Sequence, residues 1–223
     1  MMPAPDREEL TGIVLKHQPV GDYDYSVTLL TLESGKRSAF ARGARRIGTK
    51  LCGAVEPFCF GQFVLTSGRQ NDLITQVRID QYFEGFREDL NGALYGSYLL
   101  ELADYYAREY NEDAELLRLL YQSLRALLSP ALDDRLVRMI YEFRLFMIEG
   151  EFAGAAAGGY ELSEAASYAL GFIQRTPIER LYTFRLSGPV LEELVSLAGE
   201  TRRRLVDRRL KSLELLERMS DAC

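Results

Sequence analysis

The sequence predicts an α+β protein in which a small N-terminal β-barrel precedes an all-helical C-terminal domain. Two observations support this fold class: short β-rich segments separated by turn residues fill the first 80 residues, and helical periodicity of apolar residues begins after Gln81. With 223 residues and 47% hydrophobic content, the chain can bury a core in one large or two modest domains. We therefore expect one domain over residues 1–80 and another over residues 81–223.

About five strands are expected in the first domain, because β-branched and apolar runs recur there at short spacing. The runs are Gly12–Lys16, Tyr25–Leu32, Arg37–Arg42, Gln62–Thr66 and Asp72–Ile79. Ser67 and Gly68 lie between the last two runs and predict a hairpin turn. Strands of this number and spacing are typical of a small barrel.

Helices are expected over Leu90–Tyr110, Glu115–Leu128 and Arg135–Glu149, where apolar residues return to one face. Small residues from Gly150 to Gly159 predict a flexible loop near 150–160, and Ser163 is expected to cap the next helix.

Two further helices are expected at the C-terminal end. One begins near Pro189, and the other contains the Arg-rich stretch Thr201–Leu216 and ends near Met219. In this second helix we expect leucines to be buried and the arginines to face outward.

The composition excludes several classes of protein. No apolar run reaches the ~20 residues of a membrane-spanning helix, and the acidic N-terminus does not resemble a secretion signal, so we expect a cytoplasmic protein. Cys52, Cys59 and Cys223 form no closely spaced pair, which is typical of a reducing compartment and gives no metal signature.

No catalytic constellation is recognisable. The single histidine, His17, has no nucleophile in a recognisable context, and the acidic clusters fall at turns and helix starts where carboxylates cap backbone amides. Phosphate-binding loops and zinc-protease motifs are absent from the sequence. We expect no catalytic residue and no cofactor.

A basic block without acids, Ser34–Lys50, stands out in a chain whose formal net charge is -6. Its cations are Lys36, Arg37, Arg42, Arg45, Arg46 and Lys50. A local cluster can bind phosphates even when the whole protein is acidic, and Tyr23 and Phe40 are candidates for stacking on bases. The alternative is a solvated hairpin tip that only protects a sheet edge from aggregation.

Collinear stretches of the chain resemble the RecO family of bacterial DNA repair proteins. They are TGIVLKHQPVGDYDYSVTLLTLESGKRSAFARGARR, TKLCGAVEPF, FREDL, SYLLELADYY and RLKSLELLERM, and they cover most of the sequence from Thr11 to about Tyr106 and a segment near the C-terminus. The resemblance implies that the barrel is an OB-fold, a type that binds single strands.

The resemblance also implies a role in DNA repair and DNA recombination after DNA damage. It implies binding of single- and double-stranded DNA, single-strand annealing without ATP, and loading of RecA, together with RecR, onto DNA covered by single-stranded DNA-binding protein (SSB). The acidic C-terminal tail of SSB is expected to bind the arginine cluster formed by Arg202, Arg203, Arg204, Arg208 and Arg209. The alternative for this cluster is a solvated helix face.

One feature departs from the family pattern. Many members carry a four-cysteine zinc module in the C-terminal half, but the stretch EFAGAAAGGYELSEAASYAL contains no cysteine. We therefore expect no structural metal. At a separate position, Cys52 stands where the family resemblance leads us to expect a basic residue. Two other hypotheses remain open: a non-catalytic scaffold whose helical domain recruits partners, and a hydrolase whose site the sequence does not reveal.

Overall fold

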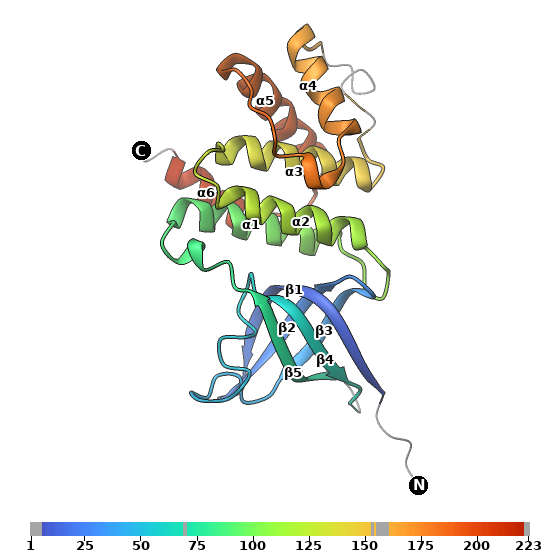
Figure 1. Ribbon diagram of the computed structural model, residues 1–223, viewed down its shortest axis with the longest axis vertical. Helices are drawn as coiled ribbons and strands as arrows, with labels where there is room; N and C mark the ends of the chain where they lie inside the picture. Colours follow the sequence, from blue (N-terminus) through green and yellow to red (C-terminus); the bar gives the residue numbers. More distant parts are fainter. Residues whose placement is uncertain (1–5, 69–70, 153, 155–160, 221–223) are drawn as a thin grey trace. The chain divides into compact units, whose positions relative to one another are not determined.

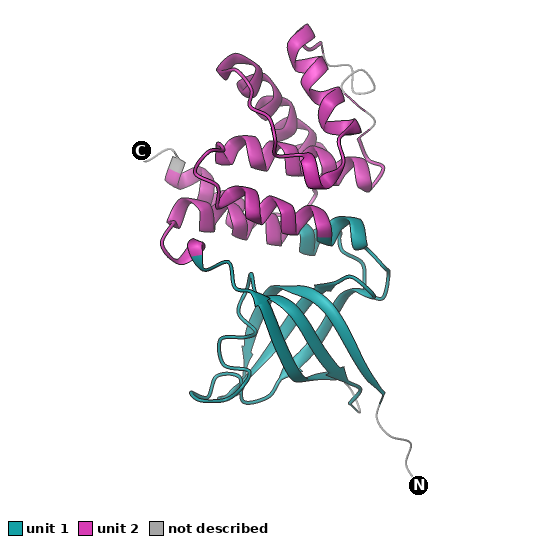
Figure 2. Cartoon of the chain, viewed as in Figure 1, with its two compact units in different colours: residues 1–84, 103–117 teal, residues 85–102, 118–223 magenta. Residues whose placement is uncertain are grey.

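The computed structural model describes residues 6–68, 71–152, 154 and 161–220, so that most of the loop expected near 150–160, together with Cys223, lies outside the described residues. The chain divides into two compact units, shown in separate colours in Figure 2. Unit 1 contains residues 1–84 and 103–117, and unit 2 contains residues 85–102 and 118–223.

In the described part of unit 1, five strands close into a barrel with the order β1-β2-β3-β5-β4 (Figure 1). The strands are β1 (Arg7–Val20), β2 (Asp24–Thr31), β3 (Gly35–Ala41), β4 (Phe60–Thr66) and β5 (Asp72–Gln81). All neighbours are antiparallel except β3 and β5, which pair in parallel through Ala39 with Asp72 and Phe40 with Leu73. This arrangement confirms the expected OB-type barrel.

Strand β1 is much longer than the apolar run Gly12–Lys16 that predicted it. Its first half pairs with β4 and its second half with β2, and the pairing with β2 shifts register between Val14 and Lys16. Such an irregularity bends a strand and lets it belong to both sides of a barrel. The polar ends of β1 are therefore held by partner strands, which a local pattern of residues does not show.

The barrel is filled by alternate side chains of its strands. Val14, Val27, Leu29, Phe63 and Leu65 are almost completely buried in this core. Along β3, buried positions alternate with partly exposed ones, as expected for a strand with one face toward the core. The less buried positions of β3 carry Lys36, Ser38 and Phe40, whereas Arg37 stands at a buried position.

Residues 103–117 are fastened to the barrel within unit 1. The Nζ atoms of Lys16 and Lys36 lie 2.6 Å and 3.4 Å from the buried Asp104 carboxylate, and the Lys36 amide donates to the Arg108 carbonyl at 2.9 Å. Gly35 has a φ of +56°, and a Cβ there would lie 2.0 Å from the Asn111 carbonyl oxygen. Glycine is therefore required where this segment crosses the start of β3.

The remaining elements are helical. They are the 3-10 turns η1 (Glu84–Arg87) and η3 (Ile178–Arg180), and the helices α1 (Leu90–Tyr106), α2 (Ala114–Leu127), α3 (Asp134–Ile148), α4 (Glu164–Arg175), α5 (Gly188–Leu205) and α6 (Lys211–Ser220). Ser163 caps α4 as expected, with its hydroxyl accepting from the Ala166 amide. Across the described ranges, no helix is both long and apolar enough to span a bilayer.

The prediction of one continuous helix through Thr201–Leu216 is wrong. Helix α5 ends at Leu205, Val206 has an extended backbone, and α6 begins only at Lys211. The start of α6 is fixed by Glu101, whose carboxylate accepts the amides of Lys211 and Ser212. This tertiary capping contact within unit 2 overrides the helix propensity of the Arg-rich stretch.

Candidate nucleic-acid interface

Two adjoining pockets of about 590 Å³ and 440 Å³ form a groove on the barrel. Val20, Asp24 and Arg42 line both pockets. We call these pockets the barrel groove; its other lining residues are Gly21, Asp22, Tyr23, Phe40, Gly43, Arg46, Thr49, Gly68, Asn71 and Leu73. The groove therefore lies between the β1–β2 loop, the end of β3 and the β4–β5 loop. In OB-folds this combination of a strand face and two loops is a common site for oligonucleotides.

A cation and a ring meet directly in the barrel groove, where the guanidinium carbon of Arg46 lies 4.1 Å from the centre of the Tyr23 ring. Beside the groove, but not lining it, the guanidinium carbon of Arg45 lies 5.9 Å from the centre of the Tyr25 ring. Tyr23 is 49% exposed. A base could stack on such a ring while a neighbouring cation binds its phosphate.

The loop after β3 is held in place by the β1–β2 loop. The Gly43 amide donates to the Asp24 carboxylate at 2.7 Å, the Arg45 amide donates to the Tyr23 carbonyl at 3.0 Å, and the Arg45 guanidinium donates to the Gly21 carbonyl at 3.0 Å. Both loops thus form one wall of the groove. The cations at this wall are presented on a braced backbone.

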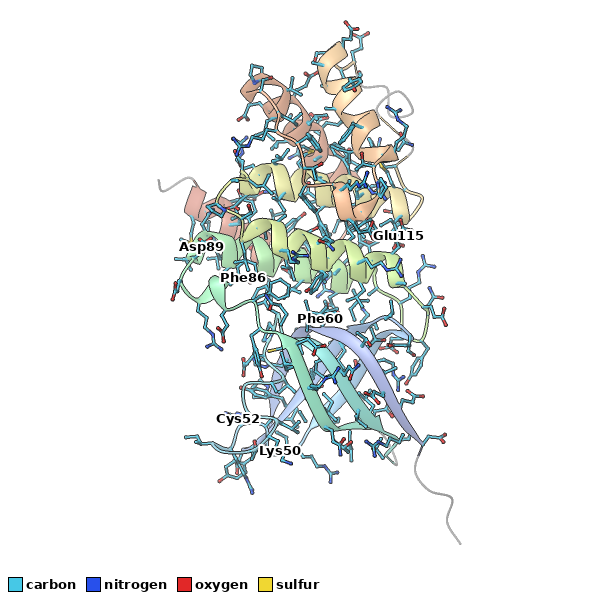
Figure 3. All side chains as sticks on the ribbon, in the orientation of Figure 1. Lys50, Cys52, Phe60, Phe86, Asp89 and Glu115 are labelled. Atoms are coloured by element: carbon cyan, nitrogen blue, oxygen red, sulfur yellow. The ribbon has the colours of Figure 1, made fainter. Side chains whose placement is uncertain are left out.

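Four of the six cations of the basic block lie at the surface, although one of them, Arg45, also donates to the Gly21 carbonyl. Arg42, Arg45, Arg46 and Lys50 are exposed, and within the described part of the chain none of them forms an ion pair. Lys50 and Cys52 lie on the long loop between β3 and β4, as Figure 3 shows. Two acids, Asp22 and Asp24, line the groove as well, but Asp24 is engaged by the Gly43 amide.

The other two cations of the block, Lys36 and Arg37, form ion pairs within unit 1. Arg37 is 5% exposed, and its guanidinium donates to Glu8 at 2.6 Å and to Asp72 at 2.5 Å. Burial alone would lower the pKa of Arg37, but the bonds to Asp72 and Glu8 outweigh it and raise the pKa. Lys36 is held by Asp104. We therefore leave Lys36 and Arg37 out of the candidate interface, contrary to the sequence-based expectation.

Of the two predicted stacking residues, Phe40 lies at the β3 wall and Tyr23 at the β1–β2 loop. The structure thus brings Tyr23, Phe40, Arg42 and Arg46 to one groove. Sequence reasoning missed the part of the groove that is formed by Gly68, Asn71 and Leu73, of which Leu73 pairs with Phe40. The predicted hairpin at Ser67 and Gly68 marked this segment as a turn, but only closure of the barrel places it beside β3.

His17 is a packing residue. Its ring stacks on Tyr25 with the centroids 4.0 Å apart, and its Nδ1 lies 3.3 Å from the Val55 carbonyl. Among the residues that the structure describes, no three His, Cys, Asp or Glu side chains are grouped so that they could hold a metal ion.

The C-terminal arginines divide into a buried one and a surface group. Arg202 is 5% exposed and donates at 2.9 Å to the buried Glu142, which also accepts from Arg138 and Tyr98. The expectation that Arg202 faces outward is therefore wrong, because this buried carboxylate requires counter-charge. Arg203, Arg208 and Arg209 line a pocket of about 280 Å³ with apolar groups including Val206, Leu210 and Leu213, and Arg202, Glu214 and Glu217 line it as well. Arg209 also pairs with Glu214 on the wall of this pocket, whereas Arg204 is exposed and does not line it.

Comparisons with known proteins give a consistent family. Residues 6–83 match the model of the recombination protein O N-terminal domain, and residues 87–151 match that of the recombination protein O C-terminal domain. The DNA repair protein RecO of Clostridium novyi is 26% identical over 92% of this chain and 91% of its own length. That of Desulforamulus reducens is 26% identical over 95% and 94%, and that of Anaeromyxobacter dehalogenans is 40% identical over 55% and 49%.

Proposed function

The chain belongs to the RecO family of DNA repair proteins, and on this basis we propose that it is a recombination mediator that binds DNA in the barrel groove. The observation that supports this most strongly is the meeting of Arg42 and Arg46 with Tyr23 and Phe40 along one groove. Phosphates would bind the cations, and bases would stack on the rings. Single strands can use both kinds of contact, and duplexes can use the phosphate contacts.

This mode of binding is compatible with annealing. Contacts to phosphates and to the faces of bases leave the pairing edges of the bases free for a complementary strand. Pairing is itself favourable and needs no nucleotide hydrolysis. We therefore propose annealing without ATP and assign no catalytic residue. As the family resemblance implies, we further propose that the protein acts with RecR to help load RecA onto SSB-covered single strands.

The pocket formed by Arg203, Arg208 and Arg209 is our candidate site for the acidic tail of SSB. Guanidinium groups can bind carboxylates through two parallel hydrogen bonds, and Leu210 and Leu213 offer apolar contacts to the rest of a peptide. The sequence predicted a site on one continuous Arg-rich helix, and this pocket takes its place as the candidate. It also accommodates the scaffold hypothesis, in which recruitment is the main role of the helical unit.

The salt dependence of DNA binding tests the proposed function. If Arg42, Arg45, Arg46 and Lys50 each neutralise one phosphate, log affinity against log salt should have a slope of roughly -3 for single strands, from about -0.7 per contact. Fluorescence anisotropy with a labelled oligonucleotide over a salt series measures this slope. Replacing Arg42, Arg45 and Arg46 by glutamate should remove most of the salt dependence and abolish annealing.

A charge-matched control distinguishes the effect of losing the site from the effect of changing the net charge. Arg118, Arg125 and Arg180 are exposed on unit 2, and their replacement by glutamate changes the net charge equally. This control variant should keep the wild-type slope, and circular dichroism should show both variants folded. A folded groove variant that binds single strands with wild-type affinity and slope would refute the proposal.

A further inference from the structure

Ile47 is the most exposed of the large apolar side chains in the described part of the chain. It is 99% exposed, although isoleucine is among the residues most often buried. Its neighbours in the basic block include Arg45, Arg46 and Lys50. A single exposed apolar residue carries little meaning by itself, so the argument depends on how the backbone presents it.

The backbone around Ile47 is a closed and braced turn. The Thr49 amide donates to the Arg46 carbonyl at 3.3 Å, and the Thr49 hydroxyl donates to the carbonyls of Gly43 and Arg46 at 3.0 Å and 3.1 Å. Gly48 has a φ of +84°, which the third position of a type II turn requires. Ile47 therefore occupies the outer corner of a turn whose shape is set before any ligand binds.

The turn stands at the rim of the barrel groove. Arg46 and Thr49, the first and last residues of the turn, line the groove, whereas Ile47 between them does not. The Arg46 guanidinium is stacked over Tyr23, which fixes this end of the turn to the β1–β2 loop. A DNA strand bound in the groove would thus pass the branched apolar side chain of Ile47 where it leaves the groove.

We propose that Ile47 is an apolar wedge that packs against the face of a nucleobase at the mouth of the barrel groove and separates it from the neighbouring base. The proposal rests on the proposed DNA binding and adds a base contact to it. Proteins that unstack DNA commonly insert an aliphatic side chain between two bases, next to cations that hold the phosphates. In this protein Arg45, Arg46 and Lys50 would supply the phosphate contacts. A base displaced in this way is exposed for pairing with an incoming strand.

Single-stranded oligonucleotides carrying 2-aminopurine at successive positions test the wedge, because the fluorescence of this base increases when it is unstacked. We expect the wild-type protein to increase the signal at one position. In Ile47→Ser the increase should disappear and the affinity should fall roughly tenfold, since burial of the side chain is lost. The salt slope should not change, because the cations remain. Ile47→Leu should keep the signal.

Leu90→Ser is the matched control, since Leu90 is an exposed leucine of unit 2. It should leave both affinity and fluorescence unchanged. If the wild-type protein binds but Ile47→Ser matches it in affinity and signal, the wedge is refuted while the proposed function stands. The same holds if Ile47→Ser impairs only the binding of a protein partner. If the wild-type protein does not bind DNA, both proposals fail.

Discussion

The Arg46 guanidinium lies over the ring of Tyr23, with 4.1 Å between its central carbon and the ring centroid. The two residues come from different loops, and both line the barrel groove. The pair places a cation over an aromatic ring and connects the loop after β3 to the β1–β2 loop.

Replacing Tyr23 by alanine should weaken single-strand binding roughly tenfold, because one stacked base loses its platform. Tyr23→Phe should bind as the wild type does, since the ring is retained. Anisotropy titrations at one fixed salt concentration measure both variants. Equal loss in the two variants would indicate that the hydroxyl, and not the stacking surface, is the binding group.

Replacement by methionine should lower the stability of the protein at Arg37 and the salt dependence of DNA binding at Arg42. Arg37→Met leaves Asp72 and Glu8 without their counter-charge and should cost about 2 kcal/mol of unfolding free energy, less than for a fully buried pair because Glu8 is half exposed. Arg42→Met should change stability by less than about 0.5 kcal/mol and reduce the salt slope by about 0.7. Urea unfolding and salt titrations separate the two effects. An unchanged unfolding free energy in Arg37→Met would contradict its structural role.

Replacing Glu142 by glutamine should destabilise unit 2 by about 3 kcal/mol, because Arg138 and Arg202 would remain buried without a carboxylate. Burial opposes ionisation of Glu142, but Arg138 and Arg202 outweigh it and hold the carboxyl pKa below its ordinary value of 4.5. A lowered pKa in the folded state stabilises the protein above pH 4.5, and this contribution is lost as the pH falls further.

The difference in unfolding free energy between wild type and Glu142→Gln should therefore be constant near neutral pH and shrink in acid. Urea unfolding over a pH series measures it. A difference that grows below pH 4.5 would contradict the lowered pKa of Glu142.

The double replacement of Arg203 and Arg208 by glutamate should weaken binding of an SSB tail peptide at least roughly tenfold, because two carboxylate-binding groups are reversed. DNA binding by the barrel groove should not change. Anisotropy of a labelled peptide measures the effect, with Arg118→Glu and Arg125→Glu together as the charge-matched control. Wild-type peptide binding in the Arg203 and Arg208 variant would exclude this pocket as the site.

Much of the fold could be predicted because it depends on local patterns. Alternating β-branched runs separated by glycine turns indicated the barrel, and the periodicity of Leu90–Tyr110 indicated the first helix. The last helix could not be predicted correctly. Its interruption after Leu205 depends on Glu101, a residue distant in sequence that caps α6 at Lys211 and Ser212.

For the candidate site, the sequence by itself determined that six cations stand in one acid-free block with Tyr23 and Phe40 nearby, because composition and spacing are properties of the chain alone. The tertiary structure decided which cations remain available. Closure of the barrel brings Glu8 and Asp72 into ion pairs with Arg37. The attachment of residues 103–117 brings Asp104 into an ion pair with Lys36. A charge whose side chain leaves water needs a counter-charge, and sequence distance does not tell which acid will supply it.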